Sequence, residues 1–365
     1  MKELINNAQH IVIFTHMAPD GDAMGSALAM WHYCKDRLRL TEHGPATPDR
    51  PQAKPADRTQ TIIVPNAFPA FLGWMPGAEE IRIYEQKAQE CDRLIAEADL
   101  IICTDFNDPK RIGPMGEKMI ANPCPKVLID HHLMDRPVDG FWTEVHSHPE
   151  ASSACEIVHR LLDRLRLTEH RPATPDRPLT LTEEIATCLY TGLMTDTGNF
   201  SYNSNNPEIY EMVASLLRAG AKKDEIYDRV FNQYSTDRMR LTGYALYRKM
   251  RIFPEHHLAL ITLTASELEQ YHYKQGDCEG LVNMPLQIGD VFYSVFMREE
   301  RPKPGTPKPR IRISFRSQGD RPVNIWASEV FHGGGHMNAS GGELFGSLEQ
   351  AVKLLENTYK NYLKQ

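Results

Sequence analysis

The chain has 365 residues, more than most single domains contain, so two domains are the default expectation. Hydrophobic residues make up 41% and charged residues 24%, which is the mix of a folded globular protein and excludes a disordered chain. The formal net charge of −7 argues against a protein that coats nucleic acid, although it leaves room for a local basic cleft.

The chain has none of the sequence features of a membrane or secreted protein. No stretch approaches the roughly 18 uninterrupted apolar residues of a membrane helix, and residues 1–14 lack the charged, apolar and small-residue regions of a signal peptide. The seven cysteines are scattered without a C-x-x-C pair, which is typical of reduced thiols and not of a disulfide framework or a zinc site. We therefore expect a cytoplasmic protein with no membrane partner.

The first half of the chain alternates β-branched runs with helical patterns. Strand and helix signals in alternation are typical of βαβ units around a largely parallel sheet. The predicted buried strands are residues 11–14, 61–64, 100–103 and 126–129, with an amphipathic helix at 22–38. Helical patterns then dominate from 151 to about 253, including one helix from Pro207 to Gly220 and a long connector at 236–252.

From about His257 the pattern changes to that of a small α+β domain. Its predicted elements are strands at 258–263, 291–297 and 310–316, a helix around 279–287 and a last helix at 347–363. We therefore predict an α/β fold with two domains: a mostly parallel sheet with flanking helices over 1–245, a helical linker over 246–256, and a smaller α+β domain over 257–365.

Two segments of the chain are nearly identical. Residues 36–51 (DRLRLTEHGPATPDRP) and 163–178 (DRLRLTEHRPATPDRP) differ only at Gly44 and Arg171, and their flanks are unrelated, so they are not a duplicated fold unit. We interpret them as inserted surface loops, spanning 37–60 and 164–179, whose role the sequence leaves open. A third Pro-rich stretch, 301–309, predicts an extended hairpin loop.

Ionisable side chains follow four predicted elements at the point where each element ends. Because the carboxyl ends of parallel strands meet at one edge of a sheet, we expect these side chains to converge there. Any one acid is explained equally well as a turn or N-cap residue, but four elements that end alike are poorly explained in that way. The side chains are His16, Asp20 and Asp22 after the first strand, Asp105 after the third, Asp130, His131 and His132 after the fourth, and Asp196 after a helix at 186–194.

Imidazole and carboxylate ligands without thiolates suit a borderline-hard cation such as Mn²⁺ better than a structural zinc, with Mg²⁺ or Co²⁺ as substitutes. Two such ions about 3.5–4 Å apart that share Asp105 would favour in-line attack of hydroxide on phosphorus. Gly25 and Ser26 open the next helix, whose N-terminal amides favour an anion. The residues therefore predict a two-metal phosphoesterase.

This set of residues resembles the four motifs of the DHH phosphoesterase family, in order. The C-terminal part resembles the DHHA1 domain, through Ile313–Ser317 and the glycine-rich stretch Phe331–Gly341. The combination is similar to the NrnA-like oligoribonuclease and 3′-phosphoadenosine-5′-phosphate (pAp) phosphatase group of that family. The resemblance covers nearly the whole chain except the three inserted loops.

The resemblance implies a role for each matching residue. His16, Asp20 and Asp105 would hold one Mn²⁺, and the other would be held by Asp22, Asp105, His131 and Asp196. His132 would act with Asp105 in catalysis by contacting the scissile phosphate. The residues implied to bind substrate phosphates in the second domain are Arg316, Ser317, Gly333, Gly334, Gly335 and His336.

The expected function is Mn²⁺-dependent hydrolysis of short nucleotide substrates, either RNAs of two to five nucleotides, pAp, or both. The alternatives are a phosphodiesterase of linear or cyclic dinucleotides and a catalytically silent nucleotide-binding module, against which the complete ligand set speaks. A pyrophosphatase would lack the Gly-Gly-Gly-His pattern, a long-strand exonuclease would need further DNA-binding domains, and nothing suggests the basic channel of a polyphosphatase. A homodimer is compatible with the sequence, which does not rank the substrates.

Overall fold

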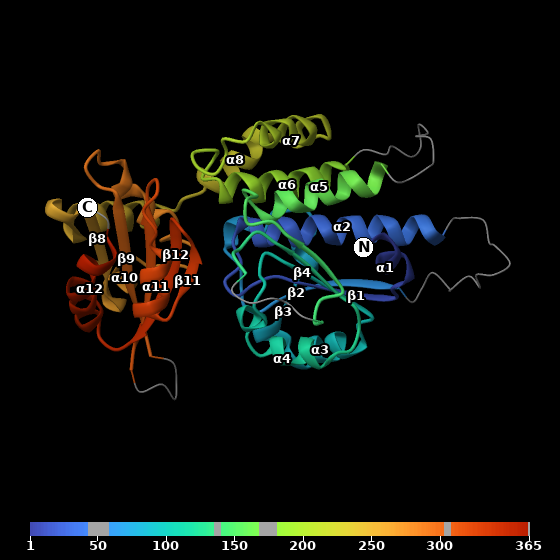
Figure 1. Ribbon diagram of the computed structural model, residues 1–365, viewed down its shortest axis with the longest axis horizontal. Coiled ribbons are helices and arrows are strands. Elements are labelled where there is room, and N and C mark those ends of the chain that lie inside the picture. The colour runs from blue at the N-terminus through green and yellow to red at the C-terminus, as the bar shows by residue number, and fades with distance from the viewer. Residues whose placement is uncertain (43–57, 135–139, 168–180, 303–307, 364–365) are drawn as a thin grey trace. The chain divides into compact units, whose positions relative to one another are not determined.

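Residues 1–42, 58–134, 140–167, 181–302 and 308–363 are described by a computed structural model of the chain. They divide into two units, Met1–Gln233 and Tyr234–Gln365. The first unit runs from blue to yellow and the second from yellow to red in Figure 1. No helix in these ranges is long and apolar enough to cross a membrane.

The first unit is built on a six-stranded sheet in which every neighbouring pair of strands is parallel. The central strands are continuous apolar runs because both faces of a parallel sheet are covered by helices. Consecutive residues of the first strand alternate between two cores, with Ile11 and Ile13 on one face and Val12 and Phe14 on the other. In spatial order the strands are β3 (Arg82–Ile83), β2 (Thr59–Val64), β1 (His10–Phe14), β4 (Leu100–Thr104), β5 (Lys126–Asp130) and β6 (Glu144–Ser147).

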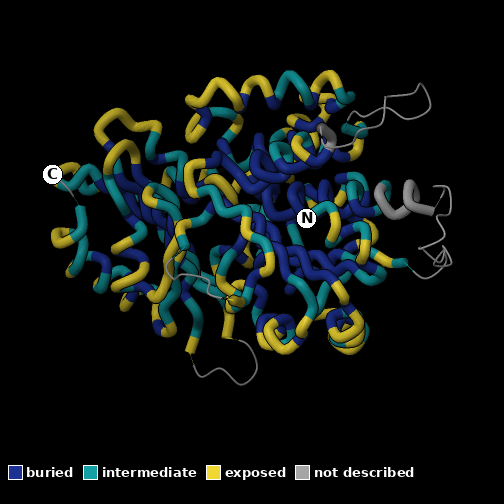
Figure 2. The backbone as a smooth tube through the Cα atoms, turned by 45° about the vertical axis from the view of Figure 1, so that its right-hand side comes forward, coloured by how far each residue is buried: buried dark blue, intermediate teal, exposed yellow. Residues whose placement is uncertain are grey.

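Helices cover both faces of this sheet (Figure 1), and the buried residues gather in the strands and in the helices that contact them (Figure 2). On one face lie α3 (Tyr84–Glu97) and α4 (Met115–Ala121). The other face carries α2 (Gly21–Glu42), α5 (Ala154–Leu167) and α6 (Glu183–Asp196), with α7 (Pro207–Arg218) and α8 (Lys223–Phe231) stacked outside them. A short helix, α1 (Lys2–Asn7), precedes the first strand.

The helices α2, α5 and α6 pack closely because glycines lie where they meet. A side chain at Gly192 of α6 would overlap the Cys155 Sγ atom and come within 3.0 Å of the Asp22 Cα atom. A side chain at Gly25 of α2 would lie 2.5 Å from the Cys188 carbonyl oxygen. These glycines therefore set the position of Asp22 relative to the start of α5.

The second unit is a mixed six-stranded sheet. Only β8 and β9 are parallel, and the other neighbouring strands are antiparallel. One face packs against α11 (Asn324–Phe331) and α12 (Leu348–Tyr362), around the buried rings of Phe315 and Trp326. The strands, in spatial order, are β11 (Gly334–His336), β12 (Ala339–Phe345), β10 (Arg310–Ser317), β9 (Tyr293–Glu300), β8 (Leu258–Leu263) and β7 (Met250–Phe253).

The opposite face of this second sheet is covered only in part. A smaller apolar cluster joins the inner strands to short helical segments, through Ile261, Leu263 and Phe296 on the strand side. The helical segments are α9 (Thr236–Tyr244), η5 (Ala245–Lys249), α10 (Ala265–Gln270) and η7 (Leu281–Gln287).

The fold class predicted from the sequence is confirmed, and the predicted strands of both units are present with shifts of a few residues. Two strands of the first sheet, β3 and β6, were not predicted. Both lie at the edges of the sheet, and β3 has only two residues, so neither carries the apolar run by which a central strand is recognised.

Three other details differ from the prediction. The division between the units falls at Gln233, earlier than the predicted linker at 246–256. The expected long helix at 236–252 is α-helical to Tyr244, continues as a π-helix over Ala245–Lys249 and ends there because Met250–Phe253 pair with β8. The predicted helix at 279–287 is a 3₁₀ helix that contains Pro285, which has no amide hydrogen for an α-helical bond.

The predicted inserted loops also begin later than expected. Residues 37–42 continue α2 and residues 164–167 continue α5, because the Leu, Arg and Glu residues of the repeat favour helix. Thr59 and Gln60 already belong to β2. The remaining parts of the two loops, 43–57 and 168–179, and the centre of the hairpin loop, 303–307, lie outside the described residues.

The helix packing leads to a stability prediction. Gly192→Ala should lower the free energy of unfolding by about 1–3 kcal/mol, because the added methyl group overlaps the Cys155 side chain. The control is Gly243→Ala in α9, where a Cβ atom meets nothing within 4 Å; it should be neutral or stabilising by up to about 1 kcal/mol. Urea-induced unfolding of the full chain measures both, and equal midpoints would contradict the packing argument.

Candidate metal centre

The ionisable residues predicted from the sequence meet at the carboxyl edge of the first sheet. The three central strands β1, β4 and β5 are neighbours, and each ends just before one of the predicted residues. The C-terminus of α6 adds Asp196 to the same place. All of them are well buried except Asp20, His132 and Asp196, which are partly exposed.

Two groups of side chains share one carboxylate. In the first group, His16 Nε2 lies 3.2 Å from Asp105 Oδ2 and 4.0 Å from Asp20 Oδ2. In the second, His131 Nε2 lies 3.3 Å from Asp105 Oδ1 and 3.7 Å from both Asp22 Oδ2 and Asp196 Oδ2. The two oxygens of Asp105 are thus turned one to each group.

The backbone and side chain of Asp105 are both unusual. Its φ angle of 65° lies in the left-handed region, which costs a non-glycine residue free energy unless the surroundings impose it. The surroundings do so here, because the Asp105 amide donates to the Ile129 carbonyl at 2.9 Å. The buried Oδ1 atom accepts no hydrogen bond of good geometry from any part of the chain that is described. A buried anion in that state needs a cation.

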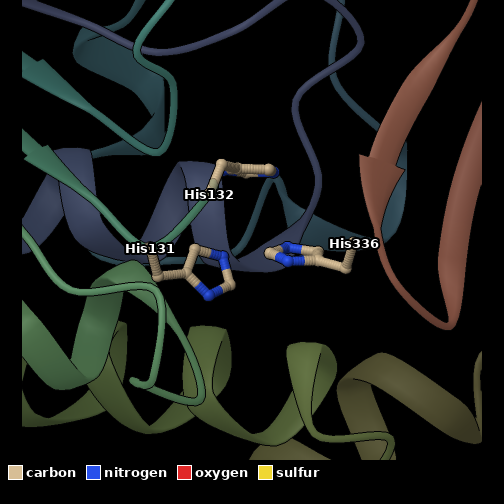
Figure 3. A group of neighbouring side chains, drawn as sticks. All are labelled: His131, His132 and His336. Atoms are coloured by element: carbon tan, nitrogen blue, oxygen red, sulfur yellow. The ribbon is translucent and has the colours of Figure 1, made fainter. Parts of the chain in front are cut away.

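The imidazoles are oriented by their other ring nitrogens. His16 Nδ1 donates to the Met17 carbonyl at 2.9 Å, and His131 Nδ1 donates to the Ala151 carbonyl at 3.4 Å, so in each ring Nε2 is the nitrogen that faces the carboxylates. His132 Nδ1 donates to Asp130 Oδ1 at 2.8 Å. The His131 and His132 rings meet edge to face, with their centroids 4.9 Å apart (Figure 3).

Two helix N-termini hold the acids that follow β1. Asp22 accepts hydrogen bonds from the Ala154 amide at 2.6 Å and the Cys155 amide at 2.9 Å, at the start of α5. Asp20 Oδ1 accepts from the amides of Asp22 and Ala23 at the start of α2. Both carboxylates therefore lie where the helix dipole favours negative charge.

Sequence reasoning missed the residues that support this arrangement. Asn107 Nδ2 donates to Asp130 Oδ2 at 2.8 Å and to the Leu133 carbonyl at 3.2 Å, and so holds the carboxylate that orients His132. Its position two residues after Asp105 was the available signal. Helical structure from 151 was predicted, but the contact of its first amides with Asp22 was missed; Ser153 followed by Glu156 is the capping pattern that marks this helix start.

The pKa shifts follow from the crowding of charges. Burial, together with the charge of Asp105, raises the pKa of Asp22 to about 7. Burial and the neighbouring carboxylates also raise the pKa of Asp196. Burial opposes the ionisation of Asp105 as well, but the adjacent imidazoles of His131 and His16 hold its pKa well below the usual value.

The pKa values of the two imidazoles are raised, although burial by itself would lower them. Burial disfavours the cation of His131, but the adjacent Asp105 carboxylate and the charges of Asp196 and Asp22 raise its pKa well above the usual value. The pKa of His16 is also raised, because Asp105 and Asp20 outweigh burial and the charge of Arg111. Without a metal, the site therefore binds protons in place of cations.

The donor set fits divalent cations. Carboxylate oxygens and imidazole nitrogens converge without a thiolate, and the groups that could hold an ion include His16, Asp20 and Asp105 and also Asp22, His131 and Asp196, with two acids in each. The second nitrogens of His16 and His131 are bound to backbone carbonyls, as is usual for metal-binding imidazoles. The orphaned Asp105 Oδ1 atom gives an independent reason to expect a cation.

The remaining predicted residues belong to the second unit. Arg316 lies on β10 opposite Ala339, and its Nη1 donates to its neighbour's carbonyl, that of Phe315, at 2.9 Å. His336 is the last residue of β11. The buried Ser317 hydroxyl is engaged internally, since it donates to the Arg321 carbonyl and accepts from Asn338 Nδ2 at 2.9 Å. A direct bond from Ser317 to substrate would have to replace one of these.

The glycine run of the second unit has a packing role as well as a predicted binding role. A side chain at Gly333 would collide with the Gly341 carbonyl. Gly335 has a φ angle of 136°, and a side chain there would lie 2.6 Å from the Ala339 carbonyl oxygen. These two glycines allow β11 to pair closely with β12, whereas at Gly334 a Cβ atom would meet nothing within 4 Å.

Comparison with known proteins agrees with the geometry. Residues 10–193 match the family described as the DHH family, N-terminal domain. The chain therefore belongs to the DHH family of phosphoesterases and is a hydrolase.

Three relatives cover nearly the whole chain. An exopolyphosphatase-related protein from Bacteroides fragilis has a crystal structure that matches with a TM-score of 0.82 and 42% identity, over 99% of this chain and 94% of that chain. The bifunctional oligoribonuclease and PAP phosphatase NrnA of Thermus thermophilus is 28% identical over 349 residues, which cover 94% of this chain and 87% of that protein. The cyclic-di-AMP phosphodiesterase GdpP of Bacillus subtilis is 24% identical over 100% of this chain but only 49% of its own length.

The pKa shifts predict how the metal-free protein responds to pH. In EDTA, the Tm should fall as the pH rises from about 5 to 8. Asp22 keeps its proton in the folded state until about pH 7 but loses it near 3.8 when unfolded, so stability is lost across that interval. The raised pKa of His131 acts in the same direction at higher pH, because its stabilising proton is lost as the pH passes its folded-state pKa.

Asp22→Asn should flatten this fall, because it removes one of the titrating groups and keeps an oxygen acceptor for α5. Asp108→Asn is the matched control, since Asp108 caps the short helix η4 (Pro109–Ile112) at the surface and Asn caps equally well. Thermal unfolding followed by circular dichroism at steps of pH measures the slope. A Tm of the unsubstituted protein that rises over this interval would contradict the assignment.

Proposed function

We propose that this chain is a manganese-dependent phosphoesterase that hydrolyses short nucleotide substrates, namely RNAs of two to five nucleotides and pAp. The observation that carries the proposal is the Asp105 carboxylate, whose two oxygens are turned to two separate groups of acids and imidazoles. The substrate class is supported by the NrnA relative, whose name states an oligoribonuclease and a PAP phosphatase and of which this chain covers 87%.

We infer that two divalent cations bind to these groups, with Mn²⁺ as the native ion and Mg²⁺ or Co²⁺ as substitutes. His16, Asp20 and Asp105 would hold one of them. The second would be held by Asp22, Asp105, His131 and Asp196. Bound there, the cations would supply the positive charge that acidifies a water molecule and neutralises the phosphate.

The protein's own residues prepare the site for this chemistry. Two amide hydrogen bonds from the start of α5 hold the Asp22 carboxylate at the place where the second group needs it. Asn107 and Asp130 fix His132 through its Nδ1 atom, so His132 acts on substrate through Nε2. When its ring carries both protons, Nε2 donates to a phosphate oxygen and stabilises the negative charge that develops there.

The reaction is a hydrolysis at phosphorus. The oxygen of a water molecule forms a bond to phosphorus while the bond from phosphorus to a ribose oxygen breaks, and the departing oxygen takes up a proton. With an RNA the products are a mononucleotide and a shorter chain, and with pAp they are adenosine monophosphate and inorganic phosphate. The second unit would bind another phosphate of the same substrate through Arg316, the Gly333–Gly335 backbone and His336.

Two other activities follow from the names of the relatives. Hydrolysis of a cyclic dinucleotide is suggested by GdpP, but this chain spans only half of that protein. Hydrolysis of polyphosphate is suggested by the name of the Bacteroides relative. A catalytically silent nucleotide-binding module is disfavoured because every predicted ligand is retained. A cytoplasmic location and a homodimer remain part of the proposal.

Loss of the shared carboxylate should abolish turnover. Asp105→Asn is expected to lower kcat by roughly three orders of magnitude on any substrate, because one oxygen of the pair is replaced by an amide nitrogen that cannot bind a cation. Asn tolerates the left-handed backbone at this position, so the substitution tests the chemistry and not the fold. Asp108→Asn should keep full activity. Equal rates for these two variants would refute the site.

A substrate panel tests the substrate class. Protein stripped with EDTA should be inactive, and added Mn²⁺ should restore release of mononucleotide from RNA dinucleotides and of phosphate from pAp. Cyclic di-AMP and polyphosphate serve as the competing substrates, compared by kcat/KM. A preference for either of these over both pAp and dinucleotides would overturn the proposed substrate class, while a lack of any Mn²⁺-dependent turnover would overturn the mechanism.

A further inference from the structure

One face of the second sheet carries a row of arginines that differ in their partners. Residues 310, 312, 314 and 316 of β10 point away from the core formed by Ile311, Ile313 and Phe315. The strand register places Arg298 and Glu343 on either side of Arg312, and Glu300 beside Arg310. This face is therefore lined by charged groups near one end of β10.

The two acids of this face, Glu300 and Glu343, are already hydrogen-bonded to two of the arginines. Arg310 Nε donates to Glu343 Oε2 at 2.7 Å, and its Nη1 lies 3.7 Å from Glu300 Oε2. Arg298 Nη2 donates to Glu300 Oε1 at 3.1 Å, while its Nη1 donates to the Tyr273 hydroxyl. Both carboxylates are thus hydrogen-bonded to neighbours of Arg312.

Arg312 has no such partner. Its guanidinium makes no hydrogen bond or ion pair with any residue of the described ranges, although it is partly buried. Burial and the adjacent charge of Arg310 lower the pKa of Arg312. Guanidinium is always charged in proteins, so an anion that reached this position would gain a partner without displacing a carboxylate.

The strip of sheet between Arg312 and Arg316 carries only small residues in its central row, and we call it the bare strip. In the row that crosses it, Ser314 lies opposite Gly341, which in turn lies opposite Gly334. Both glycines are exposed; a Cβ atom at Gly334 would meet nothing within 4 Å, and at Gly341 only a backbone oxygen 3.8 Å away. Glycines inside strands often mark a place where a ligand approaches the backbone closely. A flat group can therefore lie here on the backbone of β11, β12 and β10.

We propose that Arg312 binds an additional phosphate of an oligonucleotide whose sugar or base lies on the bare strip and whose neighbouring phosphate is held by Arg316. Four residues of extended strand separate the two Cα atoms by about 13 Å, a distance that two long side chains bridge to phosphates on either side of one nucleoside. The inference rests on the proposed function and deepens it. Arg312 becomes a residue that favours RNAs of three or more nucleotides over pAp.

Phosphate count is the basis of this preference. pAp has two phosphates, one to be cleaved and one for Arg316, and leaves none for Arg312. A 5′-phosphorylated trinucleotide has three. Removal of the Arg312 guanidinium should therefore affect the longer substrate selectively, whereas general damage to the sheet would affect both.

The experiment compares Arg312→Gln with Arg310→Gln, which removes the same charge from the same face of the same strand but from an arginine that is already paired. For Arg312→Gln, kcat/KM should fall about tenfold on a 5′-phosphorylated RNA trinucleotide and stay within twofold on pAp. Arg310→Gln should stay within twofold on both substrates. Equal losses on the two substrates, or no loss on the trinucleotide, would overturn the role of Arg312.

A binding measurement separates this inference from the proposed activity. Fluorescence anisotropy of a labelled 5′-phosphorylated RNA pentanucleotide, in EDTA, reports binding without turnover. The slope of log K against log salt concentration should decrease by about 0.7 in Arg312→Gln, the value for one phosphate contact to a single strand, and Arg312→Lys should restore it. An unchanged slope would refute the contact. Failure of the proposed function would appear instead as an inactive unsubstituted protein whose RNA binding still depends on Arg312.

Discussion

At one edge of the parallel sheet, the first unit buries more carboxylates than imidazoles, and this excess of acids is the constraint on which the rest of the unit depends. Asp105 lies at the centre, held in a left-handed backbone conformation, with an oxygen that accepts no hydrogen bond of good geometry from the described residues. Such a cluster is costly in an apolar interior, and protons or cations must compensate for it. In the metal-free protein, protons compensate for it, as the raised pKa values of Asp22 and His131 indicate. In our proposal, a pair of Mn²⁺ ions takes their place.

The rest of the first unit keeps this cluster in place. The start of α5 donates two amides to Asp22, and its approach to α2 and α6 requires the glycine at 192. On the other side, Asn107 and Asp130 hold His132. Helix packing and hydrogen bonding thus serve the same purpose, which is to fix charged groups at short distances from one another before any ligand arrives.

The second unit differs from the first in the ligand proposed for it and in the groups that would bind that ligand. The partners proposed for it are phosphates, which need hydrogen-bond donors and a close approach and do not need a buried cluster of ligands. The glycine-rich edge strand β11 would allow the backbone itself to meet the ligand, and arginines on β10, two strands away, would supply charge. Arg298 and Arg310 already have acidic partners, whereas Arg312 makes no ion pair within the described ranges, and our proposal therefore gives Arg312 a separate role.

The sequence by itself determined the parallel sheet, the central strands and the set of ionisable residues, because strand periodicity and the position of acids after apolar runs are local properties. It did not predict β3 and β6, which are edge strands, nor the end of the helical segment at Lys249, which is decided by the pairing of Met250–Phe253 with β8. The tertiary structure alone decided that Asp105 faces two groups, that Asn107 and the α5 amides support them, and that the acid beside Arg312 is hydrogen-bonded to Arg310 instead. Those facts depend on contacts between residues far apart in the chain, which no local pattern encodes.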